Sequence, residues 1–332
     1  MQTLTRRAAL ALPLAMTVRP TAGTFAQAAA WKPQGTVRIV VPQAPGGTTD
    51  VMARFLAAHL QTRWSQSVVV ENKPGAGGAI GTMDVVRSTP DGHSILIGNV
   101  GPQSIAYTLQ REIPYGPDDL IPVSNMIHGP NALVINPAIP ATTVPEFVAY
   151  LRANPGKANF GTPGIGQSPH LAGVWFSQLT GTQSTPVHYR GAGPAATDLI
   201  GGTIQFMFDA LVNATEPAKA GLVRLLAVTG IDRYPNLPDI PAIRETMPEL
   251  ASFASTSWVG VFLAKGTPAP IVEALNGEIK ALLEQAGQRE RFIGMGGLPG
   301  YSSAGDYAAF VRAETQKWAA VIKRAGLSVT AN

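Results

Sequence analysis

The chain has 332 residues, of which 45% are hydrophobic and 14% are charged, so it has enough apolar sequence for the cores of two ordinary domains. It contains no cysteine, which excludes disulfides, thiolate metal sites and a cysteine nucleophile. The formal net charge is +4, of which +3 comes from Arg6, Arg7 and Arg19; the remaining +1 predicts no basic surface for nucleic acid.

Residues 1–28 have the features of a secretory signal peptide. An arginine pair precedes an apolar stretch at residues 8–18, and small residues offer cleavage near Ala26 or Ala28. The arginine pair is compatible with the twin-arginine route and with the general route. The apolar stretch has about 11 residues, whereas a membrane-spanning helix needs about 20. We therefore expect an exported, soluble protein in the periplasm.

Strand and helix patterns alternate along the mature chain. Short apolar or β-branched runs predict strands, and apolar residues at helical spacing predict helices. The expected strands are residues 37–41, 67–70, 94–97, 133–135, 159–160, 185–188, 206–208, 223–228 and 256–263. The expected helices are residues 50–61, 79–88, 144–153, 169–179, 194–200, 270–284 and 306–324. The first strands and helices predict a parallel sheet with crossover helices, which makes the fold class α/β.

A glycine-containing loop follows the first expected strand, where residues 40–50 read VVPQAPGGTTD. The glycine pair allows a tight turn and lets a ligand approach the backbone. We expect Thr48 or Thr49 to act as the N-cap of the next helix, with Asp50 in its first turn. The free N–H groups and partial positive charge of a helix start suit a carboxylate without an arginine.

A second loop of the same kind occupies residues 159–170, which read NFGTPGIGQSPH. Ser168 is expected to be the N-cap and Pro169 the first helical residue. Either loop alone is also compatible with an ordinary helix cap after a turn. Open parallel sheets bind ligands beyond the carboxyl ends of their strands. Two such loops facing each other therefore predict that an anion is held from both sides.

Two enzyme interpretations are less consistent with the sequence. Residues 71–81, ENKPGAGGAIG, follow a strand as a dinucleotide fingerprint does, but Ile80 stands where the third glycine belongs. A hydrolase could use Ser168 and His170, but no G-x-S-x-G turn surrounds the serine. The five histidines have no metal-ligand spacing. We therefore expect no catalytic residues, no cofactor and no metal.

The mature chain resembles the extracytoplasmic solute receptors of tripartite tricarboxylate transporters, the Bug-type or TctC-like receptors. The resemblance covers residues 31–327 and rests on the order and spacing of several motifs. These are VVPQAPGGTTD (40–50), VVVENKPGAGG (68–78), PHLAG (169–173), YRG (189–191), DLIGG (198–202), MFD (207–209) and LLAVT (225–229).

The resemblance implies a two-domain periplasmic binding protein of the Venus-flytrap kind, type II-like, with mixed sheets flanked by helices and a hinged cleft. Domain one is expected at residues 31–131 plus 255–332, and domain two at residues 132–254. The implied function is capture of a small carboxylate (a mono- or dicarboxylate or an aromatic acid) for a tripartite transporter, without catalysis. Membrane subunits of that transporter are then the expected partners of a monomer, and a sensory receptor with a signalling partner is the alternative.

In the resembling family, loops equivalent to residues 43–50 and 161–170 grip one carboxylate by backbone amides, hydroxyls and ordered water. Gln43 stands where the family often has an aromatic residue, and His188 where it often has proline. The expected ligand-binding residues are Gln43, Ala44, Gly47, Thr48, Asp50, Gly161, Thr162, Gly166, Gln167, Ser168, His170, Tyr189 and Asp209.

Three of the side chains near the expected cleft have two interpretations each. His170 either donates a hydrogen bond to the ligand or caps its own loop. Asp209 either contacts the distal part of the ligand or accepts hydrogen bonds from a helix N-terminus. Arg190 either pairs with the ligand or lies on the rim in a salt bridge.

Overall fold

The computed structural model describes residues 31–189, 191–294 and 296–328. The expected signal peptide, both cleavage sites and Arg190 lie outside the described residues. Within these residues, no helix combines the length and apolar character needed to cross a membrane.

Ten strands and the helices between them make up the described chain. The strands are β1 (Val37–Val41), β2 (Val68–Asn72), β3 (Ser94–Asn99), β4 (Leu120–Ile135), β5 (Ala158–Thr162), β6 (Ser184–His188), β7 (Phe206–Ala210), β8 (Arg224–Val228), β9 (Thr256–Ala264) and β10 (Leu298–Pro299). The helices are α1 (Thr48–Trp64), α2 (Ala79–Val86), α3 (Ala106–Leu109), α4 (Val144–Ala153), α5 (Ser168–Thr180), α6 (Ala192–Ile200), α7 (Leu211–Lys219), α8 (Ala269–Leu283), α9 (Gln288–Gly294) and α10 (Ala304–Ala325). Short helical turns are η1 (Ala76–Gly78), η2 (Gly101–Ile105), η3 (Pro117–Asp119), η4 (Ile243–Glu245) and η5 (Pro248–Leu250).

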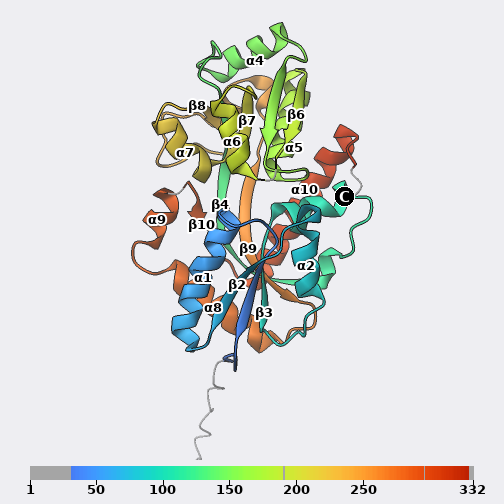
Figure 1. Ribbon diagram of the computed structural model, residues 1–332, viewed down its shortest axis with the longest axis vertical. Helices are drawn as coiled ribbons and strands as arrows, with labels where there is room; N and C mark the ends of the chain where they lie inside the picture. The colour runs from blue at the N-terminus through green and yellow to red at the C-terminus, as the bar shows by residue number, and fades with distance from the viewer. Residues whose placement is uncertain (1–30, 190, 295, 329–332) are drawn as a thin grey trace, which may run out of the picture. The chain divides into compact units, whose positions relative to one another are not determined.

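The strands form two sheets that share the long strand β4 (Figure 1). The first has the order β2-β1-β3-β9-β4-β10, and we call it lobe one, together with α1 to α3 and α8 to α10. The second has the order β8-β4-β7-β5-β6, and with α4 to α7 it forms lobe two. Strand β4 leaves β9 after Pro130 and joins β7 at Asn131, beside the domain boundary expected at residues 131 and 132.

The sequence pattern predicts most of these elements closely. The strand at residues 37–41 and the helix at 144–153 have the expected bounds, and β1, β2 and β3 are parallel as predicted. The expected strand at 133–135 is only the end of β4, which begins at Leu120. Helices α7 and α9 are not predicted by the sequence pattern.

The sheet of lobe one is buried on both faces. Alternate residues of β1, namely Val37, Ile39 and Val41, pack into the cluster that contains α1 and α8 residues. Val40 points to the opposite face and belongs to the cluster that also contains residues of β3 and α10. A strand places successive side chains on opposite faces, so a nearly continuous apolar run indicates helices on both sides.

An aromatic core fills lobe two and continues into lobe one. Phe206 of β7 packs against Phe147 of α4 with ring centroids 5.1 Å apart. Trp175 of α5 stacks on Phe253 at 4.8 Å and meets Trp318 of α10 at 6.5 Å. Helix α10 therefore packs against both lobes, and the lobes share one continuous core on this side of the molecule.

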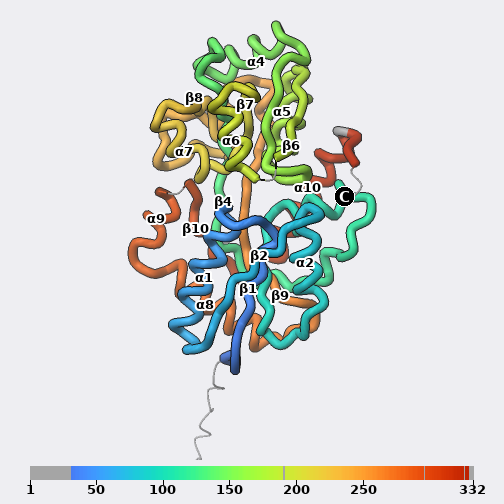
Figure 2. The backbone as a smooth tube through the Cα atoms, viewed as in Figure 1, coloured from blue at the N-terminus to red at the C-terminus, as the bar shows by residue number. Residues whose placement is uncertain are grey.

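Three chain segments are tied together by buried hydrogen bonds where β4 and β9 pass between the lobes (Figure 2). The Asn131 N–H donates to Thr229 Oγ1 at 2.8 Å, and the Thr229 hydroxyl lies within hydrogen-bonding distance of the carbonyls of Asn131 and Ser255. Asn131 Nδ2 also donates to Ser255 Oγ at 3.1 Å. All three residues are fully buried, so this cluster fixes the geometry of the crossing.

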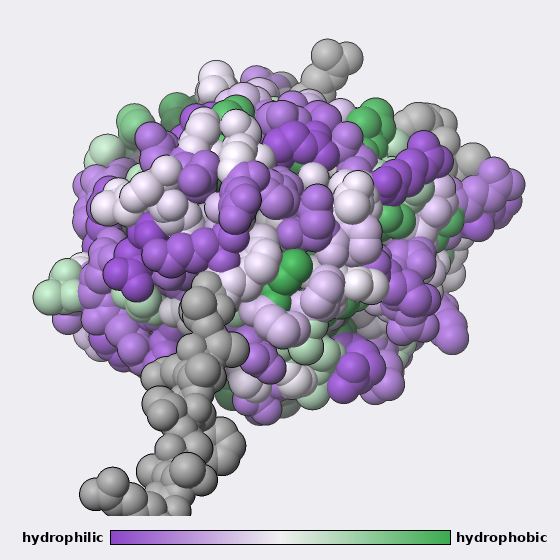
Figure 3. All heavy atoms as spheres, turned by 90° about the horizontal axis from the view of Figure 1, so that it is seen from below, coloured by the Kyte–Doolittle hydropathy of each residue, from purple (hydrophilic) through white to green (hydrophobic). Residues whose placement is uncertain are grey.

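The surface of lobe one opposite lobe two is mainly hydrophilic. Figure 3 shows this face, on which polar side chains dominate and hydrophobic residues form only small spots. The apolar residues of the lobe are instead gathered in the two clusters on either side of its sheet.

Thr229→Val tests the crossing cluster, because valine keeps the volume of threonine and removes the hydroxyl. We expect the free energy of unfolding to fall by about 1–3 kcal/mol, the cost of leaving buried polar groups without a partner. Urea unfolding measures it. Thr62→Val is the control, since its exposed hydroxyl bonds only Ala58 O within α1. Equal losses in both variants would contradict the special role of Thr229.

Candidate functional site

The loops before α1 and α5 end in helix starts that carry no side-chain cap. The N-caps are Gly47 and Gln167, whose carbonyls accept the first helical bonds from Val51 and Leu171. The expectation that Thr48 or Thr49, and Ser168, serve as caps is therefore wrong. The backbone leaves the extended conformation one residue earlier than predicted, at Gly47 with ψ 170° and at Gln167 with ψ 156°. No side-chain oxygen then occupies the N–H groups of either first turn.

The carboxylate of Asp50 holds the first loop from inside. It accepts hydrogen bonds from Gly46 N–H, from Asn72 Nδ2 and from the Arg54 guanidinium, all at 3.0 Å. Asn72 Nδ2 also donates to the carbonyl of Gln43. Burial alone would raise the pKa of Asp50, but these hydrogen bonds outweigh it and hold the pKa below its ordinary range. Asp50 therefore holds the loop in position, and both of its carboxylate oxygens already accept hydrogen bonds within the protein.

Thr162 and His170 do the same for the second loop. Gly164 N–H donates to Thr162 Oγ1 at 3.3 Å, and Gly166 N–H donates to His170 Nδ1 at 3.3 Å. Gly164 and Gly166 have φ of 148° and 77°, so the loop needs glycine at both positions. In this structure His170 therefore caps its own loop, which is the second of its two interpretations.

A cavity of about 580 Å³ lies between the two loops. Its wall comes from the segments that follow β1, β2, β5 and β6 and from the η2–α3 segment that follows β3, so it lies beyond the carboxyl ends of parallel strands. Its volume suits a small organic molecule. The lining residues are Pro42, Gln43, Ala44, Pro74 to Gly78, Gly101, Ala106, Leu109, Gln110, Pro163 to Gln167, His188 and Tyr189. None of these described residues is charged at neutral pH.

Five of the expected binding residues line this cavity, and the other eight do not. Those in the lining are Gln43, Ala44, Gly166, Gln167 and Tyr189. Gly161, Thr162, Ser168 and His170 are buried outside the lining, as is Asp50, whereas Gly47 is exposed next to the first loop.

Tyr189 and His188 form the lobe-two wall of the cavity. The Tyr189 hydroxyl donates to Asp198 at 2.7 Å, and burial together with this carboxylate raises the pKa of Tyr189 to about 12. His188 Nδ1 lies 3.0 Å from Thr162 Oγ1, and its ring is 4.9 Å from that of His170. Partial burial lowers the pKa of His188, so this wall presents neutral polar groups at pH 7.

Asp209 lies apart from the cavity, at the start of α7. Its Oδ1 accepts hydrogen bonds from Ala210 N–H at 2.7 Å and from Asn213 Nδ2 at 3.0 Å. Burial raises the pKa of Asp209 to about 6 despite these bonds. These hydrogen bonds favour the interpretation in which Asp209 accepts from a helix N-terminus.

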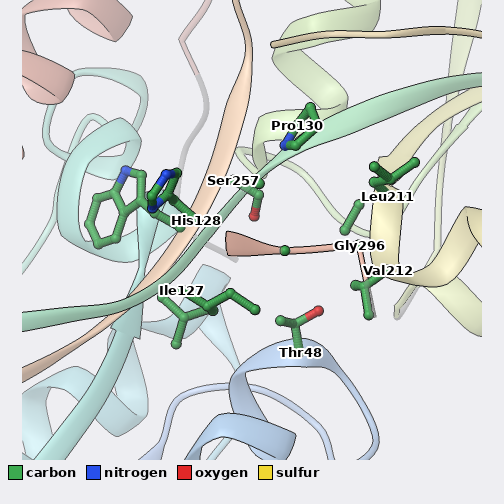
Figure 4. A pocket seen from close by; sticks show the side chains of 13 residues that line it. Thr48, Ile127, His128, Pro130, Leu211, Val212, Ser257 and Gly296 are labelled. Atoms are coloured by element: carbon green, nitrogen blue, oxygen red, sulfur yellow. The ribbon is translucent and has the colours of Figure 1, made fainter. Parts of the chain in front are cut away.

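Thr48 lines a second, much smaller pocket where the two lobes meet. Figure 4 shows Thr48 of α1 near Val212 of α7, with Gly296 on the other side of Val212. The pocket has about 20 Å³, room for a single water molecule. A Cβ on Gly296 would lie 2.5 Å from Val212 N, so only glycine permits this approach of the lobes.

The wall formed by η2 and α3 is the part of the site that the sequence does not identify. Residues 101–110 carry no cap signal and no helical periodicity, and nothing in the sequence places Gly101, Leu109 and Gln110 near a ligand. The glycine-rich turn at residues 74–78 is recognisable only as a motif, although its glycines at positive φ border the cavity.

Comparisons with known proteins point to one family. Residues 52–327 match the model of the tripartite tricarboxylate transporter family receptors. Protein BugT of Bordetella pertussis is 34% identical over 298 residues, which is 89% of this chain and 90% of that protein.

Solved structures also resemble the described fold over most of its length. Rpa4515 of R. palustris with adipate has a TM-score of 0.85 and 33% identity, covering 89% of this chain and 99% of that one. MatC of Rhodopseudomonas palustris with bound malate has a TM-score of 0.80 and 31% identity, covering 87% and 99%. The periplasmic binding protein BugD has a TM-score of 0.81 and 33% identity, covering 89% and 99%. The predicted α/β binding-protein fold is thereby confirmed.

The buried imidazole of His170 predicts acid sensitivity. Burial and the neighbouring His188 lower its pKa to about 4, whereas an unfolded histidine titrates near 6.5. Between about pH 6.5 and pH 4 the unfolded chain binds a proton that the folded protein does not, so the free energy of unfolding falls as the pH drops through this range.

His170→Asn should flatten that dependence, because an asparagine carbonyl still accepts from Gly166 N–H and does not titrate. Urea unfolding at a series of pH values between 4 and 7 measures the slope in both proteins. An unchanged slope in the variant would show that His170 does not cause the acid sensitivity.

Proposed function

This chain belongs to the tripartite tricarboxylate transporter receptor family, a family of periplasmic solute-binding proteins, and we propose that it captures a small organic acid in the cavity between its lobes. The observation that carries the proposal is the pair of uncapped helix starts, one in each lobe, whose preceding loops form opposite walls of that cavity.

A carboxylate matches these helix starts in charge. The first N–H groups of a helix lack partners and carry about half a positive charge. The Asp50 and Thr162 side chains hold the loops in place without occupying those N–H groups. A bound carboxylate can therefore accept backbone hydrogen bonds from α1 and α5 together.

The relatives support an organic acid as ligand. The names of two similar structures describe adipate with Rpa4515 and malate with MatC, and both are carboxylates. For this chain we propose the same chemical class, delivered to membrane subunits of a tripartite transporter. Export with removal of the signal peptide near Ala26 or Ala28, and a monomeric state, complete the proposal.

The first test is a thermal-shift panel on the mature protein with adipate, malate and aromatic acids, each beside its neutral primary amide. A ligand at 100 times its dissociation constant adds about 2.7 kcal/mol to the free energy of unfolding. We expect such stabilisation by at least one acid and none by its fully amidated analogue. No shift with any acid, or equal shifts with acid and amide, would contradict carboxylate capture.

Gly47→Ser tests the helix start of α1 directly. Gly47 has φ −83°, and a Cβ added there would have open space around it out to 4 Å, so serine fits without strain. As an N-cap, its hydroxyl would accept from the N–H groups proposed for the ligand. We expect unfolding stability to rise by a few tenths of a kcal/mol while affinity falls roughly tenfold to a hundredfold, the loss of a hydrogen bond to a charged group.

Gly277→Ser in α8 is the matched control for this substitution. Gly277 has open space around the position of an added Cβ, and serine there also stabilises a helix slightly. Its affinity, measured by calorimetry, should equal that of the unsubstituted protein. Unchanged affinity in Gly47→Ser would remove the α1 helix start from the site.

A further inference from the structure

Two glutamine side chains in the cavity wall have amide atoms without hydrogen-bond partners. Neither Nε2 nor Oε1 of Gln43 is bonded, and Oε1 of Gln110 is also unbonded. These atoms are shielded from solvent, although both residues border the cavity. Buried polar side-chain atoms nearly always have a hydrogen-bond partner. Leaving these amide atoms without one is therefore energetically unfavourable.

The two glutamines reach the cavity from different segments of lobe one. Gln43 follows β1, and its backbone carbonyl is fixed by Asn72 at 3.1 Å. Gln110 follows α3, and its Nε2 lies 2.8 Å from where a Cβ on Gly77 would be. Gly77 has φ 64°, so the glycine-rich turn leaves space for this amide. The backbone of Gln43 is therefore held in place, and the side-chain oxygens of both glutamines remain without partners.

We propose that Gln43 and Gln110 recognise a neutral polar group at the far end of the ligand, a hydroxyl or a carboxamide. The proposal rests on the carboxylate capture proposed above and adds the chemistry of the opposite end. Rotation about the glutamine side-chain bonds turns each amide from its shielded position into the cavity that the residue borders. The ligand class is then a monocarboxylate with a hydroxylated or amidated tail.

The donors and acceptors of the two amides select this class over others. An amide offers two donors and one acceptor, and Gln43 lacks both kinds of partner whichever way its amide is turned. A second carboxylate could accept from Nε2 but would face Oε1 with another acceptor. A methyl group would satisfy neither atom. A hydroxyl or a carboxamide both donates and accepts, so it can pair with each glutamine.

Calorimetry with four acids of matched length tests the proposal. Adipamate and ω-hydroxyhexanoate carry a neutral polar end, heptanoate carries a methyl end, and adipate carries a second carboxylate. We expect the two neutral polar acids to bind roughly fivefold to tenfold more tightly than heptanoate for each hydrogen bond gained, and more tightly than adipate. Gln43→Met and Gln110→Met, which keep the side-chain length, should each reduce this preference over heptanoate.

Gln61→Met, at an exposed position of α1, is the control and should leave all four affinities unchanged. Because the readout is a ratio of affinities within one variant, a general loss of folded protein does not imitate it. Equal binding of the acids, a preference for adipate, or a preference that survives both substitutions would overturn the proposal. Failure of all four acids to bind, together with a thermal-shift panel without hits, would instead contradict the carboxylate capture itself.

Discussion

The unpaired N–H groups in the first turn of a helix are the feature on which the proposed site depends. In α1 and α5 the residue before the helix is Gly47 or Gln167, and no side chain caps either start. An uncapped start has lost a stabilising interaction of about 1 kcal/mol, and an anion placed there restores it. Because β1 and β5 both end at the cavity, the two-sheet fold brings the loops before both starts to one cavity.

Several polar side chains that are expected ligand contacts hold the loops in shape in this structure. Asp50 is bonded to Gly46, Arg54 and Asn72, and His170 is bonded to Gly166. The polar residues of these motifs therefore support the loop backbone. Such support keeps the glycine backbone rigid, so the N–H groups need little reorganisation on binding.

The sequence predicts the fold well wherever local pattern and tertiary environment agree. β1 is a nearly continuous apolar run in a sheet covered on both faces, and α4 has a capping box at Thr143 and Glu146, so both have their expected bounds. The first part of β4 escapes prediction because Pro122 and Pro130 interrupt it and register shifts follow Pro122 and Asn125. For the site, glycine-rich loops carry a recognisable signal. Gln110 carries none, because only the tertiary fold brings α3 to the cavity.

In the proposed site, the groups that bind the carboxylate differ from the side chains that discriminate between acids. Backbone N–H groups at helix starts would hold any carboxylate there in the same way, and the loop positions follow from glycines and from buried bonds such as those of Asp50. Discrimination between acids must then come from residues that bear side chains on the remaining wall, such as Gln43, Gln110 and Tyr189. These side chains can change without disturbing the core that joins the lobes through Trp175 and Trp318. One fold can thus keep its anion grip while its ligand changes, which agrees with adipate in one similar structure and malate in another.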